Sequence, residues 1–227
     1  MLINADFSKM VIIKPEDYHW VKSPRGEVER VMFDRIGDEV ARATSLVKYP
    51  PDSIFPKHQH PLGEEILVLS GVFTENTELD YPVGWYLRNP HNSIHQASSQ
   101  EGTLIFVKLM QMSIQETEQT QINTTDPTNW ISSVDRMICP LFKSEDEQTY
   151  LEKLVPHQIF IETSDQGIEI FIIEGQIFKN TEIYPSGSWI RLPPKCHANF
   201  QAGTSGATLY VKTNHLLRAQ KLWNDKS

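Results

Sequence analysis

The sequence is poor in features that would point to several common classes of protein. It has two cysteines in 227 residues, Cys139 and Cys196, too few for a disulfide framework. It has no apolar run as long as a membrane span, and its N-terminus lacks the basic start and apolar core of a secretion signal. These absences favour a cytoplasmic protein with reduced thiols and no membrane contact, although one bridge between the two cysteines stays open.

Basic charge is scarce as well. The chain has 21 Lys and Arg against 29 Asp and Glu, a formal net charge of -8. The densest basic stretch, residues 25–35, is interrupted by Glu27, Glu29 and Asp34. Because a nucleic-acid partner requires a basic face for its phosphates, this balance argues against DNA or RNA binding.

Helix-forming stretches with apolar periodicity are few. Val, Ile, Thr and aromatic residues cluster instead in short runs separated by Pro, Gly, Asn and Asp, which predicts an all-β fold. The length allows one large domain or two of about a hundred residues each.

An internal repeat favours two domains. Residues 65–73 recur as residues 169–177, and the segment Asn-Thr-Glu at residues 76–78 recurs at 180–182 with the same offset. A period of this length indicates a duplicated barrel rather than a solenoid. The predicted division is a first barrel over residues 1–112, a polar linker over 113–128 and a second barrel over 129–227.

The strongest functional signal is a group of three histidines and one glutamate in the first copy. His58 and His60 are two residues apart, so on a strand both side chains point to the same face. Pro61 and Gly63 interrupt the run before Glu64 opens the next strand, and His95 follows about thirty residues later. Imidazole and carboxylate donors suit zinc, iron, manganese, nickel or copper, so the set predicts a site for one metal ion.

These residues resemble the two sequence motifs of the cupins. The first motif is matched by His58, His60, Glu64 and Gly71, and the second by Gly84, Pro90 and His95. The usual Gly of the second motif is Asn92 here, and the Asn expected after the histidine is Ser99. The resemblance implies a bicupin, two tandem antiparallel double-stranded β-helix (jelly-roll) barrels, with a metal held by His58, His60, Glu64 and His95.

Glu65 is an alternative to Glu64 as the carboxylate ligand. Glu65 follows Glu64 directly, and strand parity sends the two side chains to opposite faces, so only one of them can be a ligand. Glu65, Trp85 and Tyr86 are candidates to line or support the pocket, and His91 is expected to be a solvated loop residue.

The second copy has lost the ligand set. With Gly71 aligned to Gly175, residues Glu162, Ser164 and Ile168 stand where the first copy has its ligands, and a shift by one residue restores no imidazole. His197 lies near the place of His95, but an isolated histidine on a strand is more often structural. We therefore expect one metal per chain, in the first barrel, with the second barrel as a support.

Several stretches resemble the ChrR cupin-like subgroup in particular. They are residues 20–26, 28–35, 41–51, 60–65, 87–90 and 106–109. That subgroup includes the C-terminal domain of an anti-sigma factor, where this ligand set holds zinc, and metal-dependent dioxygenases that cleave carbon–carbon bonds beside carbonyls. The helical His-x3-Cys-x2-Cys zinc motif of the anti-sigma segment is missing from this sequence.

The resemblance leaves two functions open. The first is a ChrR-like stress sensor or regulator that binds a small ligand at one divalent metal, with zinc favoured and iron, manganese or nickel as alternatives. A sigma-factor partner would follow from the resemblance alone. The second is an Fe(II) dioxygenase acting on β-diketones or hydroxyketones. A purely structural zinc site is a third reading, and aromatic residues such as Trp130 can supply either a homodimer surface or core packing.

Overall fold

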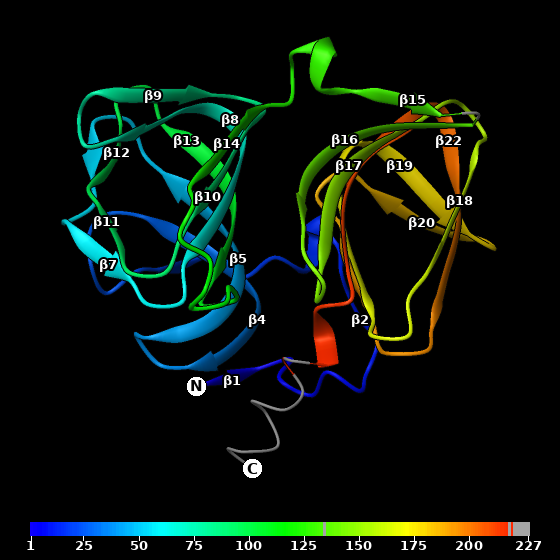
Figure 1. Ribbon diagram of the computed structural model, residues 1–227, viewed down its shortest axis with the longest axis horizontal. Helices are drawn as coiled ribbons and strands as arrows, with labels where there is room; N and C mark the ends of the chain where they lie inside the picture. The colour runs from blue at the N-terminus through cyan, green and yellow to red at the C-terminus, as the bar shows by residue number, and fades with distance from the viewer. Residues whose placement is uncertain (134, 218, 220–227) are drawn as a thin grey trace. The chain divides into compact units, whose positions relative to one another are not determined.

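The computed structural model describes residues 1–133, 135–217 and 219, and strands dominate this part of the chain. Apart from a few helical residues near Leu216, its helical elements are two 3-10 turns, Pro15–Asp17 and Pro127–Asn129. The all-β prediction is therefore confirmed. The chain forms two compact units: residues 1–3 with 19–126, and residues 4–18 with 127–227 (Figure 1).

The first unit is an antiparallel β-barrel whose main sheet follows the order β1-β4-β5-β13-β8-β10-β14. A separate two-stranded sheet pairs β7 with β11. The strands of this unit are β1 (Leu2–Ile3), β3 (Val21–Lys22), β4 (Glu29–Gly37), β5 (Ala41–Tyr49), β6 (Ser53–Ile54), β7 (His58–His60), β8 (Glu64–Glu75), β9 (Leu79–Pro82), β10 (Trp85–Asn89), β11 (Ser93–His95), β12 (Ala97–Ser99), β13 (Thr103–Leu109) and β14 (Thr120–Asn123).

The core of the first unit follows from strand parity. Ile66 and Val68 of β8 point inward and are buried beside Ile105 and Val107 of β13, to which β8 is paired. Burying each such aliphatic side chain stabilises the fold by about 1.5–3 kcal/mol. The same alternation carries Glu64 to the inner face.

A backbone bend in β8 recurs in the second unit. At Gly71, with φ of +69°, a Cβ atom would lie 1.9 Å from the carbonyl oxygen of Gly102. At Gly175, with φ of +72°, it would lie 2.2 Å from the carbonyl oxygen of Gly206. Only glycine fits either position. The two bends sit at equivalent places in β8 and β19, each twelve residues long, so the repeat seen in the sequence is a structural repeat.

The second unit is built on the sheet β15-β16-β17-β22-β19-β21-β2. Its strands are β2 (Val11–Ile13), β15 (Ile131–Ser133), β16 (Arg136–Lys143), β17 (Gln148–Leu154), β18 (Ile159–Thr163), β19 (Ile168–Lys179), β20 (Glu182–Pro185), β21 (Trp189–Leu192) and β22 (His197–Thr213). The N-terminal strand β2 pairs with β21, so residues 4–18, which the sequence division placed in the first barrel, group with the second unit.

The polar segment expected as a linker contributes to the first unit. Thr120–Asn123 forms β14, which pairs with β10, and Glu116 accepts hydrogen bonds from the guanidinium of Arg88. Both cysteines are free thiols, and burial raises the pKa of Cys139 to about 11. No helix within the described ranges has the length and apolar character needed to span a bilayer.

Candidate metal centre

Three imidazoles meet in the first unit. Strand β7 pairs with β11 in a register that sets His58 opposite His95, and His60 lies on the same face of β7 as His58. The ligating nitrogens of His58, His60 and His95 all lie within 4.8 Å of one another. Among the residues that the structure describes, this is the one group of three or more His, Cys, Asp or Glu donors close enough to hold a metal ion.

The turn between β7 and β8 delivers Glu64 to the same point. Leu62 and Gly63 both have positive φ, and a Cβ on Gly63 would lie 2.2 Å from the sulfur of Met112. This tight turn starts β8 at Glu64, whose Oε2 is 3.4 Å from Nε2 of both His60 and His95. Glu64 therefore lies beside His60 and His95, while the group of donors within 4.8 Å of one another consists of the three histidines.

Glu65 lies on the other face of β8. Its Oε2 accepts a hydrogen bond of 2.9 Å from Nη1 of Arg88, and the two buried side chains form an ion pair. Trp85 packs edge-on against Tyr81, and Tyr86 is fully buried. None of Glu65, Trp85 and Tyr86 lines the cavity beside the histidines.

His58 and His95 each form a hydrogen bond through Nδ1, which leaves Nε2 of each ring able to coordinate a metal ion. Nδ1 of His58 lies 2.8 Å from the carbonyl oxygen of Pro56, and Nδ1 of His95 lies 2.7 Å from Oε1 of Glu75. Both partners only accept, so each Nδ1 carries the proton and each Nε2 presents a lone pair. The buried Oε2 of Glu64 has no hydrogen-bond partner among the residues that the structure describes. The Nε2 lone pairs of His58 and His95 and this carboxylate oxygen are suited to binding a cation.

The spacing of the donors also fits a metal ion. Two donors bound at about 2.05 Å to one ion lie about 2.9 Å apart at octahedral angles and about 3.3 Å apart at tetrahedral ones. Nε2 of His60 and Nε2 of His95 are 2.9 Å apart, and Oε2 of Glu64 is 3.4 Å from each. The site therefore suits a four-coordinate zinc or a six-coordinate ion such as iron or nickel.

A chain of hydrogen bonds behind His95 was not predicted from the sequence. Oε1 of Glu75 accepts from Nδ1 of His95 and, at 2.9 Å, from Nδ2 of Asn89. Oδ1 of Asn89 in turn accepts from Nε2 of Gln119, which precedes β14. Such partners orient a ligating imidazole and increase its basicity.

Burial governs the charge state of the cluster. It lowers the pKa of His58, and together with the nearby imidazole of His95 it lowers the pKa of His60 to about 3, so both rings are neutral and able to coordinate. Burial also lowers the pKa of His95, but the carboxylates of Glu64 and Glu75 outweigh it and raise the pKa overall. Burial raises the pKa of Glu64.

The two departures from the cupin motif are accommodated locally. Asn92 has φ of +65°, the left-handed conformation that glycine usually supplies and that asparagine tolerates best among other residues. The hydroxyl of Ser99 donates to the carbonyl oxygen of Val72. His91, expected to be solvated, is half-buried, and its Nδ1 accepts a hydrogen bond from the backbone N–H of Leu62, which ties it to the turn before Glu64.

A cavity of about 200 Å³ opens onto the cluster, with His58, His60 and Glu64 in its wall. Aliphatic side chains of β5 and β13 form much of the remaining surface. Tyr49 also lines it, and burial together with the charge of Glu64 raises the pKa of its hydroxyl, which therefore stays protonated and able to donate. A small molecule in this cavity would touch His58, His60 and Glu64 directly.

The second unit has replaced the donor cluster with other contacts. The register of β18 against β22 pairs Glu162 with Ala198, so at the offset of the repeat Ala198, not His197, occupies the place of His95. Glu162 is bound by the hydroxyl of Tyr150 and the guanidinium of Arg136. His197 is exposed.

Part of the chain is similar to a known domain family. Residues 8–113 match the sequence profile of the ChrR cupin-like domain. This part of the chain is therefore similar to the ChrR cupin-like domain. No curated protein matches the sequence at a significant level.

Solved structures of other cupins resemble the chain over most of its length. A proposed dioxygenase from Nostoc punctiforme matches 92% of this chain and 84% of its own, with a TM-score of 0.71 and 14% identity. The pirin YhhW of Escherichia coli, solved in complex with nickel(II), matches 91% of this chain and 99% of its own, with a TM-score of 0.66 and 12% identity. At these identities the likeness shows the cupin fold alone.

Proposed function

We propose that the cupin binds one divalent metal ion through His58, His60, Glu64 and His95 and acts on a small molecule bound beside it. The observation that carries the proposal is the cavity of about 200 Å³ whose wall contains three of the four donors. Protein ligands fill all coordination positions of a structural metal site, so such a site needs no cavity beside it. Catalytic sites keep one coordination position free for water or substrate.

The favoured activity is oxygen-dependent cleavage of a carbon–carbon bond next to a carbonyl group in a β-diketone or a hydroxyketone. The bound ion would supply Lewis acidity and a template for substrate, and iron(II) suits this nitrogen and oxygen donor set. The aliphatic wall would exclude water, and the Tyr49 hydroxyl would donate a hydrogen bond to a substrate oxygen. A β-diketone and O₂ would give a carboxylic acid and a dicarbonyl, and a 2-hydroxyketone and O₂ would give two carboxylic acids. One oxygen atom of O₂ enters each product, so the reaction needs no external reductant.

The test is metal analysis followed by oxygen uptake. Protein purified without oxygen and loaded with iron(II) should consume one O₂ for each 2,4-pentanedione or hydroxyketone cleaved. A His60→Ala variant should contain no metal and consume no oxygen. Iron-loaded protein that is inert toward a panel of diketones and hydroxyketones would remove the enzymatic proposal and leave the metal site.

The second candidate is a ChrR-like regulator, and the sequence match over residues 8–113 favours it. In that function the metal would be zinc, a small reactive molecule would bind at the cavity, and a sigma factor would be the partner. One equivalent of zinc that resists chelation, no oxygen uptake, and a sigma factor recovered on the purified protein would support the regulator over the enzyme.

A further inference from the structure

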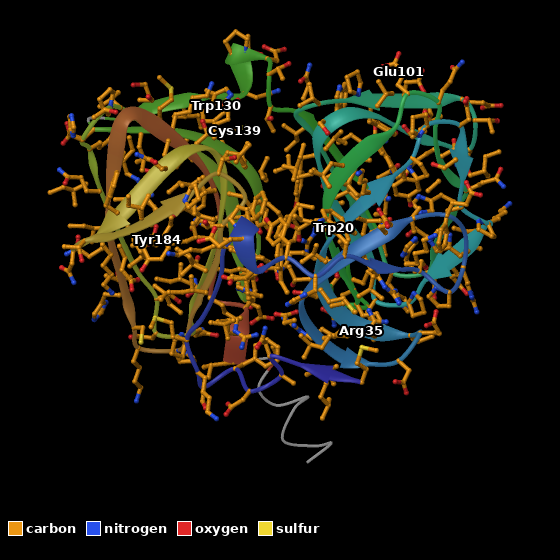
Figure 2. The ribbon with its side chains drawn as sticks, turned by 180° about the vertical axis from the view of Figure 1, so that it is seen from behind. Trp20, Arg35, Glu101, Trp130, Cys139 and Tyr184 are labelled. Carbon is orange, nitrogen blue, oxygen red and sulfur yellow. The ribbon has the colours of Figure 1, made fainter. Side chains whose placement is uncertain are left out.

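The cavity beside the metal ligands contains arginines as well as aliphatic side chains. Arg25, Arg30 and Arg35 all line it, together with two acidic side chains, Glu39 and Glu64. Arg30 and Arg35 come from β4, and Figure 2 labels Arg35 in the unit that holds the histidines.

A β-bulge brings two of these arginines to one face. In the pairing of β4 with β5, Arg30 is opposite Val47 and Arg35 is opposite Ala43, residues of equal parity on β5. The register shifts between Met32 and Asp34, so one extra residue is accommodated there. Without the bulge, strand alternation would turn Arg35 to the outer face.

Within the described part of the chain, no carboxylate forms an ion pair with either guanidinium, and the charges of Glu39 and Asp38 act on Arg35 only from a longer distance. Arg35 is 3% exposed, and its guanidinium donates only to backbone carbonyls, those of Gly37 and Asp38. Nε of Arg30 is buried and has no hydrogen-bond partner in the described chain. By contrast, the buried Arg88 outside the cavity pairs with both Glu65 and Glu116.

The missing partner is costly for the folded protein. A buried, charged donor without a hydrogen bond costs free energy, and buried arginines are normally paired. Burial and the like charge of Arg30 lower the pKa of Arg35, and the charges of Glu39 and Asp38 offset this only in part. An anion in the cavity would relieve both effects.

We infer that the molecule bound beside the metal ligands carries a carboxylate, which pairs with the guanidinium of Arg30 while its other end faces His58, His60 and Glu64. This inference rests on the proposed function, because it names the class of substrate for the same site. A planar guanidinium matches a carboxylate in two parallel hydrogen bonds. The volume of about 200 Å³ limits the ligand to a small oxo or hydroxy acid, since drug-sized ligands occupy about 300 Å³ or more.

The test compares two ligands with the same metal-binding end. Protein loaded with one equivalent of nickel(II) is titrated with 3,5-dioxohexanoate and with its methyl ester, and the visible spectrum of the nickel reports binding. Because a charge-assisted hydrogen bond contributes about 1.5–3 kcal/mol, the acid should bind about 10- to 100-fold more tightly than the ester. Inorganic phosphate, a second oxyanion, should not displace it.

Variants assign the preference to one residue. Arg30→Gln should keep the nickel and the affinity for the ester but lose the preference for the acid, and Arg30→Lys should recover part of it. Lys57→Gln removes an equal charge from an exposed residue outside the cavity lining and should keep the preference.

The outcomes separate the two proposals. Nickel-loaded protein that binds acid and ester equally, or an Arg30→Gln variant that still prefers the acid, would overturn the carboxylate inference and leave the proposed function standing. Displacement by phosphate would overturn the choice of a carboxylate. Protein that binds no nickel would overturn both.

Discussion

Glu75 gives the sharpest test of how the metal centre is supported. Its Oε1 accepts hydrogen bonds from Nδ1 of His95 and Nδ2 of Asn89, and the carboxylate is 4% exposed. Loss of such an outer partner weakens metal binding about 10- to 100-fold, or about 1.4–2.7 kcal/mol. Glu75→Gln keeps a hydrogen-bond acceptor without the charge, so its metal affinity should fall by about 10-fold. Glu75→Ala removes the acceptor altogether, so its metal affinity should fall by about 100-fold.

The assay is competition between the protein and a chromophoric chelator of known affinity for zinc or nickel. Glu78→Gln is the matched control, because Glu78 is an exposed residue of the same hairpin and its loss removes the same charge. Thermal unfolding of the metal-free proteins shows whether each variant folds. If a folded Glu75→Ala variant bound metal as tightly as the Glu78→Gln control, the argument that Glu75 orients His95 would be refuted.

Three further outcomes follow from the site and its turn. His60→Ala should abolish bound metal and His197→Ala should retain it, measured as metal per chain; loss in the second variant would show a role for the second barrel. Glu65→Gln should keep the metal but lower the free energy of unfolding by about 3 kcal/mol in urea, because the buried Arg88 loses a charged partner; an unchanged midpoint would contradict this. Asn92→Ala should lower the free energy of unfolding by about 1–2 kcal/mol, whereas Asn92→Gly should leave it nearly unchanged, because φ at this residue is +65°. Equal melting temperatures of the two variants would contradict this backbone strain.

The sequence predicted the parts of the site that depend on local spacing. The two-residue separation of His58 and His60 fixes a shared face on any strand, and parity alone separates Glu64 from Glu65. Both relations hold in the structure, where Glu65 faces Arg88. The repeat was equally visible, because β8 and β19 keep the same length and the same bend at glycine.

The parts that sequence did not reveal depend on register between distant strands. Glu75 contacts His95 because β8 pairs with β12, the strand that follows β11. No residue near Glu75 in the sequence indicates this contact. The bulge in β4 that turns Arg35 inward has no glycine to mark it. His197 stood beside the expected position, and only the pairing of β18 with β22 shows that Ala198 occupies it.

One measurement reaches the central claim without an activity assay. Crystals of the metal-loaded protein, with diffraction recorded at the absorption edge of the metal, should show one anomalous peak per chain. The peak is expected at about 2.0–2.3 Å from Nε2 of His58, His60 and His95 and from a carboxylate oxygen of Glu64. A peak elsewhere in the chain, a second peak in the second unit, or Glu65 in place of Glu64 would contradict it.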